Sequence, residues 1–291
     1  MRRAARHLAV VASLGAACVA CSTLLDLTPP PGAGDAGADA AAAADGGAPG
    51  DGGAPGDAGS PGAPDADFTF SDDFELGDLR RWTSTSVSAG DTLAVVDAGA
   101  YSGCCALQAT TIAGGSSGAG AIETWPTLGA PPVTSGTIAV RERLKVLALS
   151  DDTREFAITP AGTGSDIGTG GIGAGSSGGF AWSVLVTDPA NPSGDVGNSA
   201  ATVPGADGQW HCAELVMNVS RSAGALSVFL DGQSVAMATL QTDTTEPAGW
   251  TSAQVGLAYS SGTSAANVLL DDVVIALYND MRPRIHIGCG P

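Results

Sequence analysis

Acidic residues gather at two places that lie far apart in the sequence. Asp72, Asp73 and Glu75 follow the first apolar run, and Asp271 and Asp272 lie inside the last one. If the two runs pair as strands, these carboxylates come close together and repel one another unless a cation neutralises them. Outside the cell, Ca²⁺ with oxygen ligands is the usual solution. The alternative is that the acids form turns and edge strands in a very acidic chain.

Basic side chains form a second unusual group. Arg141, Arg143 and Lys145 alternate along one run, so they share one face if the run is a strand. A sheet face with this stripe would bind an anionic polysaccharide, with an affinity that falls as salt is added. The alternative is a solvated face on which the basic groups pair with acids across the strands. The net charge of −18 excludes nucleic acid as a partner, because phosphate binding needs clustered positive charge.

The six cysteines divide into two groups. Two of them end the N-terminal apolar stretch, and Cys104, Cys105, Cys212 and Cys289 lie in the rest of the chain. Because neighbouring side chains of a strand point to opposite faces, we expect Cys104 and Cys105 to pair with different partners, Cys212 and Cys289. The alternative is one disulfide between the two neighbours and a second between Cys212 and Cys289. Either pairing ties the C-terminal segment to the domain.

The sequence lacks the residue sets that hydrolysis requires. Glycoside hydrolysis needs two carboxylates roughly 5 to 10 Å apart, and neither Glu142 nor Glu214 has a partner at a useful spacing. His211 has core-like neighbours, which favours a packed structural role over general-base catalysis. The glycine-rich stretch 168–175 lacks the Lys-Ser/Thr that follows a phosphate loop, so a flexible loop or strand edge is the better interpretation.

Short apolar runs must position these groups. In residues 137–149 the side chains of Ile138, Val140 and Leu144 share the face opposite the basic stripe, which predicts a half-buried strand. Similar runs bounded by turn residues are 105–112, 154–160, 179–186, 253–259 and 267–278. A hairpin is predicted at 207–235 around a turn at 220–224. No segment of helical period reaches three turns, so we expect an all-β fold, an antiparallel β-sandwich.

The N-terminus resembles a bacterial lipoprotein signal peptide that covers residues 1–20. Arginines precede an apolar stretch that is too short for a membrane span, and small residues precede both Cys18 and Cys21. Cleavage before Cys21 leaves an even set of four further cysteines that can pair in an oxidising compartment, whereas cleavage before Cys18 leaves an odd thiol. We therefore predict lipidation of Cys21, with Cys18 and an ordinary secretory leader as the alternatives.

Residues 21–66 are expected to form a disordered, lipid-anchored linker. From residue 28 onward this stretch is almost wholly Pro, Gly, Ala and Asp. Such a segment cannot bury enough apolar surface to offset the entropy of ordering its backbone. Residues 67–291 have the length and composition of one large sandwich domain.

One stretch resembles a known family. GQWHCAEL at 208–215, followed by LDG at 230–232, resembles the laminin-G-like jelly rolls of the concanavalin A-like lectin and glucanase superfamily. The runs FSDDFELGDLRRW and VLLDDVVIALY resemble the first and last strands of such jelly rolls. The resemblance implies a jelly roll and a structural Ca²⁺ held by Asp73, Glu75 and Asp272, with backbone carbonyls near Ser102 and Gly103. It implies no single activity, because jelly rolls include lectins, hydrolases, lyases and adhesion modules.

These observations predict a non-catalytic carbohydrate-binding or adhesion domain on a bacterial outer-membrane lipoprotein, in contact with a glycan or surface polymer. The membrane contact is expected through the lipid anchor alone. Lectin-type recognition stacks an aromatic ring on a sugar, and Trp125, Trp182 and Trp250 are the candidates. The alternatives are an extracellular polysaccharide-degrading enzyme, a lyase or glycoside hydrolase with an atypical site, and a purely structural envelope protein.

Overall fold

The structure of the protein is a computed structural model that describes residues 65–114, 116–150, 152–160, 169–174, 180–188, 191–199, 207–282 and 287–289. The chain divides into two units, Met1–Ala54 and Pro55–Pro291, and every described residue belongs to the second. The predicted signal peptide and all of the predicted linker except Asp65 and Ala66 lie outside the described residues. No helix in the described part of the chain is long and apolar enough to cross a membrane.

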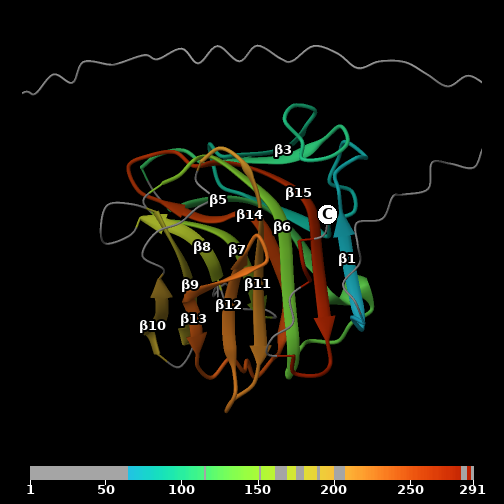
Figure 1. Ribbon diagram of the computed structural model, residues 1–291, viewed down its shortest axis with the longest axis vertical. Coiled ribbons are helices and arrows are strands. Elements are labelled where there is room, and N and C mark those ends of the chain that lie inside the picture. Colours follow the sequence, from blue (N-terminus) through green and yellow to red (C-terminus); the bar gives the residue numbers. More distant parts are fainter. Residues whose placement is uncertain are drawn as a thin grey trace, which may run out of the picture. The chain divides into compact units, whose positions relative to one another are not determined.

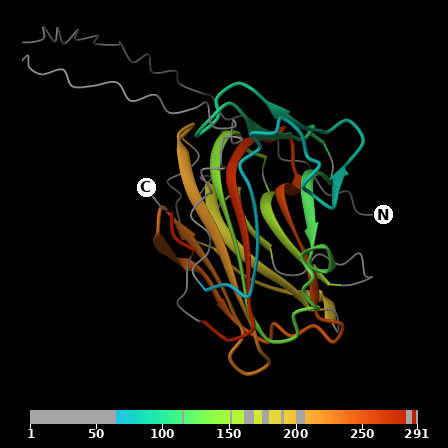
Figure 2. The ribbon, with the colours of Figure 1, turned by 90° about the vertical axis from the view of Figure 1, so that its right-hand side faces the viewer.

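The second unit is an all-β sandwich of two sheets, the jelly roll that the sequence predicts (Figure 1). Sheet A has the strand order β13-β12-β11-β6-β15-β4-β3, and β1 also pairs with β15. Sheet B has the order β10-β9-β8-β7-β14-β5-β2. Every pairing of these strands is antiparallel. Figure 2 shows the sandwich from the side, with the sheets as two layers.

The strands of sheet A are β1 (Phe68–Asp72), β3 (Thr92–Val96), β4 (Ala106–Thr110), β6 (Gly136–Ala148), β11 (Trp210–Val219), β12 (Ala225–Leu230), β13 (Gln233–Gln241) and β15 (Asn267–Tyr278). Those of sheet B are β2 (Ser84–Val87), β5 (Ser117–Thr124), β7 (Asp152–Pro160), β8 (Thr169–Ala174), β9 (Phe180–Asp188), β10 (Asn191–Ser199) and β14 (Trp250–Ser261). A short 3-10 helix, η1 (Trp125–Leu128), follows β5.

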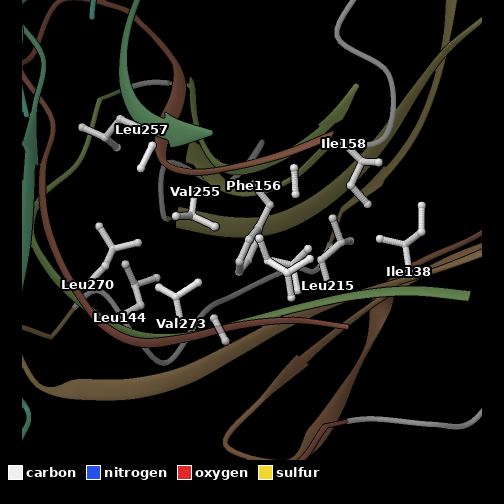
Figure 3. Close-up of a cluster of buried hydrophobic side chains, with 14 of the residues drawn as sticks. Ile138, Leu144, Phe156, Ile158, Leu215, Val255, Leu257, Leu270 and Val273 are labelled. Carbon is white, nitrogen blue, oxygen red and sulfur yellow. The ribbon is translucent and has the colours of Figure 1, made fainter. Parts of the chain in front are cut away.

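The core lies between the two sheets. From sheet A, β6, β11 and β15 contribute apolar side chains that meet those of β7 and β14 from sheet B (Figure 3). Phe156, Ile158 and Val255 are fully buried on one side, and Ile138, Leu215 and others on the opposite side. The alternation in residues 137–149 correctly predicts a strand whose apolar face covers the core.

Strand β15 divides one of its edges between two partners. Its first residues pair with β4, up to Leu270 opposite Leu107. Its later residues pair with β1, from Val273 opposite Asp72. The other edge of β15 pairs with β6 along nearly its whole length, with an irregular register between Asp271 and Val274. The two acidic groups of the sequence thus meet where β4 gives way to β1, as the predicted pairing of the first and last strands requires.

Other elements agree with the sequence or extend it. The hairpin is formed by β11 and β12, and the glycine-rich stretch at 168–175 contains β8, which pairs with β7 and β9. Strands β2, β3, β5, β10 and β13 are not predicted by the apolar runs. Strand β5, for example, begins Ser-Gly-Ala-Gly, a sequence that alternates small residues rather than apolar and polar ones.

Candidate functional site

The junction on the edge of β15 is organised by Asp271 and Asp272. Asp271 is fully buried, and Asp272 has the positive φ of 47° that accompanies the irregular register. The Asp271 carboxylate accepts hydrogen bonds from the backbone N–H groups of Tyr101 and Ser102, at 2.9 and 3.1 Å. Burial raises the pKa of Asp271 to about 6, although these hydrogen bonds act in the opposite direction. Asp271 therefore fixes the loop that precedes β4.

The acids that follow β1 form turns and buried contacts. Asp72 accepts hydrogen bonds from the Phe74 N–H at 3.1 Å and from the Trp82 indole N–H at 2.7 Å. The Asp73 carboxylate accepts from the Glu75 N–H at 3.3 Å. These bonds to residues two positions further along are typical of turn-forming aspartates. They favour the alternative interpretation of this acidic group as turn residues.

Glu75 connects this turn to the loop before β4. Both of its carboxylate oxygens accept from the Cys104 N–H, at 2.9 and 3.0 Å, and one also accepts from the Cys105 N–H at 3.3 Å. Gly103 lies against the same carboxylate, because a Cβ atom at this glycine would clash with Glu75 Oε1. Backbone N–H groups thus compensate the negative charge of Glu75 in the same way as they compensate that of Asp271.

The predicted calcium ligands lie near one another, since the charges of Asp73 and Glu75 both raise the pKa of Asp272, after the larger effect of burial. Arg141 and Arg143 act on the same carboxyl in the opposite direction. Among the described residues, no group of three or more His, Cys, Asp or Glu side chains is arranged to hold a metal ion. Calcium binding at this junction therefore stays a prediction.

The basic stripe lies on the face of β6 that points away from the core. In the pairing with β11, Arg141 is opposite Glu214, Arg143 opposite Cys212 and Lys145 opposite Trp210. Arg141 is only 2% exposed, so it does not lie on a solvated face. Its guanidinium donates to the backbone carbonyls of Gly288 and Asp272, at 3.0 and 3.1 Å, and burial lowers its pKa.

The C-terminal residues 287–289 cover this part of the sheet. The Ile287 N–H donates to Glu214, Arg143 donates to the Cys289 carbonyl, and Ile287 packs against an apolar cluster that includes Val216 and Tyr278. Burial raises the pKa of Glu214 to about 7, against the effects of the Ile287 and Gly288 N–H groups and of Arg141. Two of the three predicted ligand-binding cations are therefore engaged by the chain's own carbonyl groups.

The cysteines form the two disulfides of the alternative pairing. Cys104 is bonded to Cys105, and Cys212 is bonded to Cys289. The preferred prediction, in which Cys104 and Cys105 pair with Cys212 and Cys289, is wrong. It assumes that the neighbours lie in a strand, but β4 begins only at Ala106, and the backbone before it turns so that both cysteine N–H groups point at Glu75.

Aromatic side chains gather beside the covered cations. The rings of Tyr101 and Trp210 meet edge to face, with centroids 5.9 Å apart and planes at 70°. The Arg143 guanidinium lies 4.3 Å from the centroid of the Tyr101 ring. Tyr101 is 39% exposed and Trp210 is half-buried. We call Tyr101, Trp210, Arg143 and Lys145 the aromatic–cation cluster.

This cluster replaces the tryptophans expected from the sequence. Trp125 and Trp250 are fully buried in the core, so neither can stack on a sugar, and the side chain of Trp182 lies outside the described residues. The alternation of β11 carries a signal for Trp210, because Leu215 and Met217 face the core and even-numbered residues face away from it. Tyr101 has no such signal, because its loop is held by contacts distant in sequence.

His211 lies between two aspartates at one end of the hairpin. His211 Nδ1 is 2.8 Å from Asp231 Oδ2 and its Nε2 is 3.1 Å from Asp207 Oδ1. Burial lowers its pKa, but the two carboxylates outweigh burial and raise it above the ordinary value. This arrangement connects the two carboxylates at one end of the hairpin, and the structural role of His211 stays a prediction; His286 lies outside the described residues.

Glu142 does have an acidic neighbour, contrary to the expectation from its spacing. Glu142 and Glu155, from β6 and β7, are both fully buried. Burial, and then the charge of Glu155, raise the pKa of Glu142 well above its usual range. Since both groups lie inside the sandwich, this pair is not placed to act on a polysaccharide.

Comparisons with known proteins found similar structures but no similar sequences. No protein-family model matches the sequence, and no curated protein matches it either. An endo-β-1,4-glucuronan lyase from the fungus Trichoderma reesei is 16% identical, with 71% of this chain and 94% of that one covered and a TM-score of 0.50. The cellulose-induced protein Cip1 is 19% identical over 76% of this chain and 100% of its own, with a TM-score of 0.48.

Domain 4 of an extracellular arabinanase from Geobacillus stearothermophilus, solved in complex with arabinotriose, is 18% identical over 73% of this chain and 93% of its own, with a TM-score of 0.44. At these identities a likeness shows the fold and not the activity. The domain therefore shares its β-sandwich fold with the glucuronan lyase.

Proposed function

We propose that this domain binds carbohydrate through the aromatic–cation cluster on the outer face of sheet A. The observation that carries the proposal is the partly exposed Tyr101 ring, held by Trp210 and Arg143. Aromatic rings bind sugars by stacking on their apolar faces, and a ring with fixed orientation loses little entropy on binding. The Tyr101 N–H is bonded to Asp271, a buried aspartate of β15.

Charge gives the cluster a preference among sugars. The chain has a net charge of −18, yet Arg143 and Lys145 lie next to the rings on the same face of β6. Charged and hydroxyl groups of a glycan accept hydrogen bonds from an ammonium group such as that of Lys145, and the contact weakens as salt increases. We infer a binding site rather than a site of cleavage, because the carboxyls with the most raised pKa values, Glu142 and Glu214, are covered by protein.

A glycan array followed by titration calorimetry of the full chain tests the proposal. Tyr101→Ala is expected to weaken binding of the best glycan about tenfold, which corresponds to about 1.4 kcal/mol of stacking. Tyr259→Ala is the matched control, because Tyr259 also lies beneath a guanidinium, that of Arg154 at 4.8 Å, but on sheet B. Equal losses in the two variants, or no binding to any glycan, would refute the proposal.

A reducing-sugar and unsaturated-product assay on the same glycans separates binding from degradation. We expect binding without release of products. Release of oligosaccharides by the wild type would replace the binding proposal with the enzymatic alternative.

We also propose that the domain is displayed on the cell envelope by a lipid on Cys21. The proposal rests on the N-terminal residues and on the even number of cysteines that remain after cleavage there. Incorporation of labelled palmitate into the wild type and into Cys18→Ala, but not into Cys21→Ala, is the expected result. Loss of label in Cys18→Ala alone would move the modification to Cys18.

A further inference from the structure

We propose that the Cys104–Cys105 disulfide is a redox-responsive lock on the Tyr101 loop (residues 101–105). A small dithiol opens this bond selectively, the loop is released, and the aromatic–cation cluster loses its arrangement. The lock goes beyond the proposed function, and only its consequence for glycan binding rests on that function.

Access to the two disulfides differs. Cys104 is exposed and Cys105 is 8% exposed, so the first bond can be reached from solvent. Cys212 is fully buried and Cys289 is half-buried, on a face where residues 287–289 cover the sheet. Thiol–disulfide exchange requires that a thiolate reach one sulfur, so exposure decides which bond reacts first.

The bond between neighbouring residues holds a turned backbone. In an extended strand, successive N–H groups point in opposite directions. Here the N–H groups of Cys104 and Cys105 both point at Glu75, at distances of 2.9 to 3.3 Å. Gly103, with φ of 61°, begins this turn and touches the same carboxylate. The ring closed by the disulfide keeps the two N–H groups on one side.

The turn is connected to Tyr101 by a few residues of chain. Glu75 holds residues 104 and 105, and Asp271 holds the N–H groups of Tyr101 and Ser102. These two carboxylates anchor the loop at its two ends. The disulfide joins the two residues whose N–H groups are bound by Glu75. Once the ring opens, the segment at 104–105 can extend, the Glu75 contacts weaken, and one of the two anchors is lost.

Global stability does not explain the Cys104–Cys105 bond. A disulfide stabilises mainly by closing a loop in the unfolded chain, and the effect grows with the length of that loop. Cys212–Cys289 spans 77 residues, whereas Cys104–Cys105 spans one. The effect of the vicinal bond is therefore local, which is what a lock on one loop requires.

The reaction is ordinary thiol–disulfide exchange. A thiolate of the dithiol attacks one of the two sulfurs, a mixed disulfide forms, and the other cysteine leaves as a thiolate that takes up a proton. The second thiol of the reagent then attacks the mixed disulfide, which releases the second cysteine and leaves the reagent as a cyclic disulfide. Two electrons and two protons pass from the dithiol to Cys104 and Cys105.

Graded reduction of the full chain with dithiothreitol, followed by alkylation and peptide mass spectrometry, tests selectivity. We expect Cys104 and Cys105 to be alkylated at a reductant concentration about tenfold or more below that needed for Cys212 and Cys289. Amide hydrogen exchange under the milder condition tests the lock. Amides of the Tyr101 loop are expected to exchange about tenfold faster, while those of β6 and β15 keep their rates.

Two variants make the result specific. Cys104→Ser with Cys105→Ser should reproduce the fast loop exchange without reductant, and Cys212→Ser with Cys289→Ser should keep the loop slow until reductant is added. Reduction of Cys212–Cys289 first, or unchanged loop exchange after selective reduction, would overturn the lock. If the loop responds but neither redox form binds a glycan, the proposed function fails and the lock stands.

Discussion

The stability of this domain is expected to fall as the pH rises from 5 to 8, because buried Glu214 loses its proton in this range. Glu214 is 1% exposed between Arg141 and the C-terminal residues, and burial raises its pKa from 4.5 to about 7. Between these two pH values the folded protein holds a proton on Glu214 that the unfolded chain has released. Folding is therefore favoured by acid.

The magnitude follows from the two pKa values. The stabilising contribution is complete below about pH 4.5, decreases through pH 7, and is absent above it. At 1.36 kcal/mol per pH unit, the interval from 4.5 to about 7 corresponds to about 3 kcal/mol. For a domain of this size, that lowers Tm by about 10 °C. Asp271, with a pKa of about 6, changes stability in the same direction.

Thermal melts of the wild type and Glu214→Gln at pH 5, 6, 7 and 8 measure the effect. Gln is neutral at every pH, so we expect the two proteins to differ little at pH 5 and the variant to be more stable by about 3 kcal/mol at pH 8. Glu246→Gln, at a half-buried glutamate in the loop before β14, is the control and should follow the wild type. Parallel pH profiles for the wild type and Glu214→Gln would refute the reasoning.

Three further results are expected. Replacing Cys212 and Cys289 by Ser should lower the free energy of unfolding by about 4 kcal/mol, because the bond closes a loop of 77 residues; an unchanged denaturation midpoint would contradict this. If Asp73, Glu75 and Asp272 bind calcium, calcium chloride should raise Tm, and Asp272→Asn should abolish the rise; an unchanged Tm would contradict the metal site. Trp82→Phe should lower stability by about 2 kcal/mol in urea unfolding, because buried Asp72 loses its 2.7 Å hydrogen bond; a loss below about 0.5 kcal/mol would contradict it.

Strands whose apolar residues alternate were predictable. In β6, apolar residues alternate on the face that covers the core, and β15 is apolar along most of its length. Both patterns are typical of buried strands, so the sequence predicts both elements. Strand β5 is different, because its glycines and alanines pack closely against β14 and give no contrast between faces. Its place in the sheet depends on its neighbours, which the local pattern does not record.

The site was predictable only where it depends on strand pairing. The approach of Asp73 and Glu75 to Asp272 follows once β1 and β15 are adjacent, and this pairing is correct. The vicinal disulfide and the position of Tyr101 depend on the turn before β4, because the preferred pairing requires both cysteines to lie in a strand and β4 begins only at Ala106. The cover over Arg141 comes from residues 287–289, and the sequence alone does not indicate which strand this segment covers.

The pairing of β1 with β15 also sets how the domain bears mechanical load. Any pull on the chain before Asp65 reaches Asp67 first, which is hydrogen-bonded to Leu277 and Asn279, and reaches Asp72 last, opposite Val273. A force directed along β1 must break five residue pairs together, whereas a force across it separates them one by one. Because forced unfolding depends on the unfolding rate, these two directions give different lifetimes at equal stability. If β1 is peeled off from its N-terminal end, the acidic junction at Asp72 is loaded only after the rest of β1 has detached from β15.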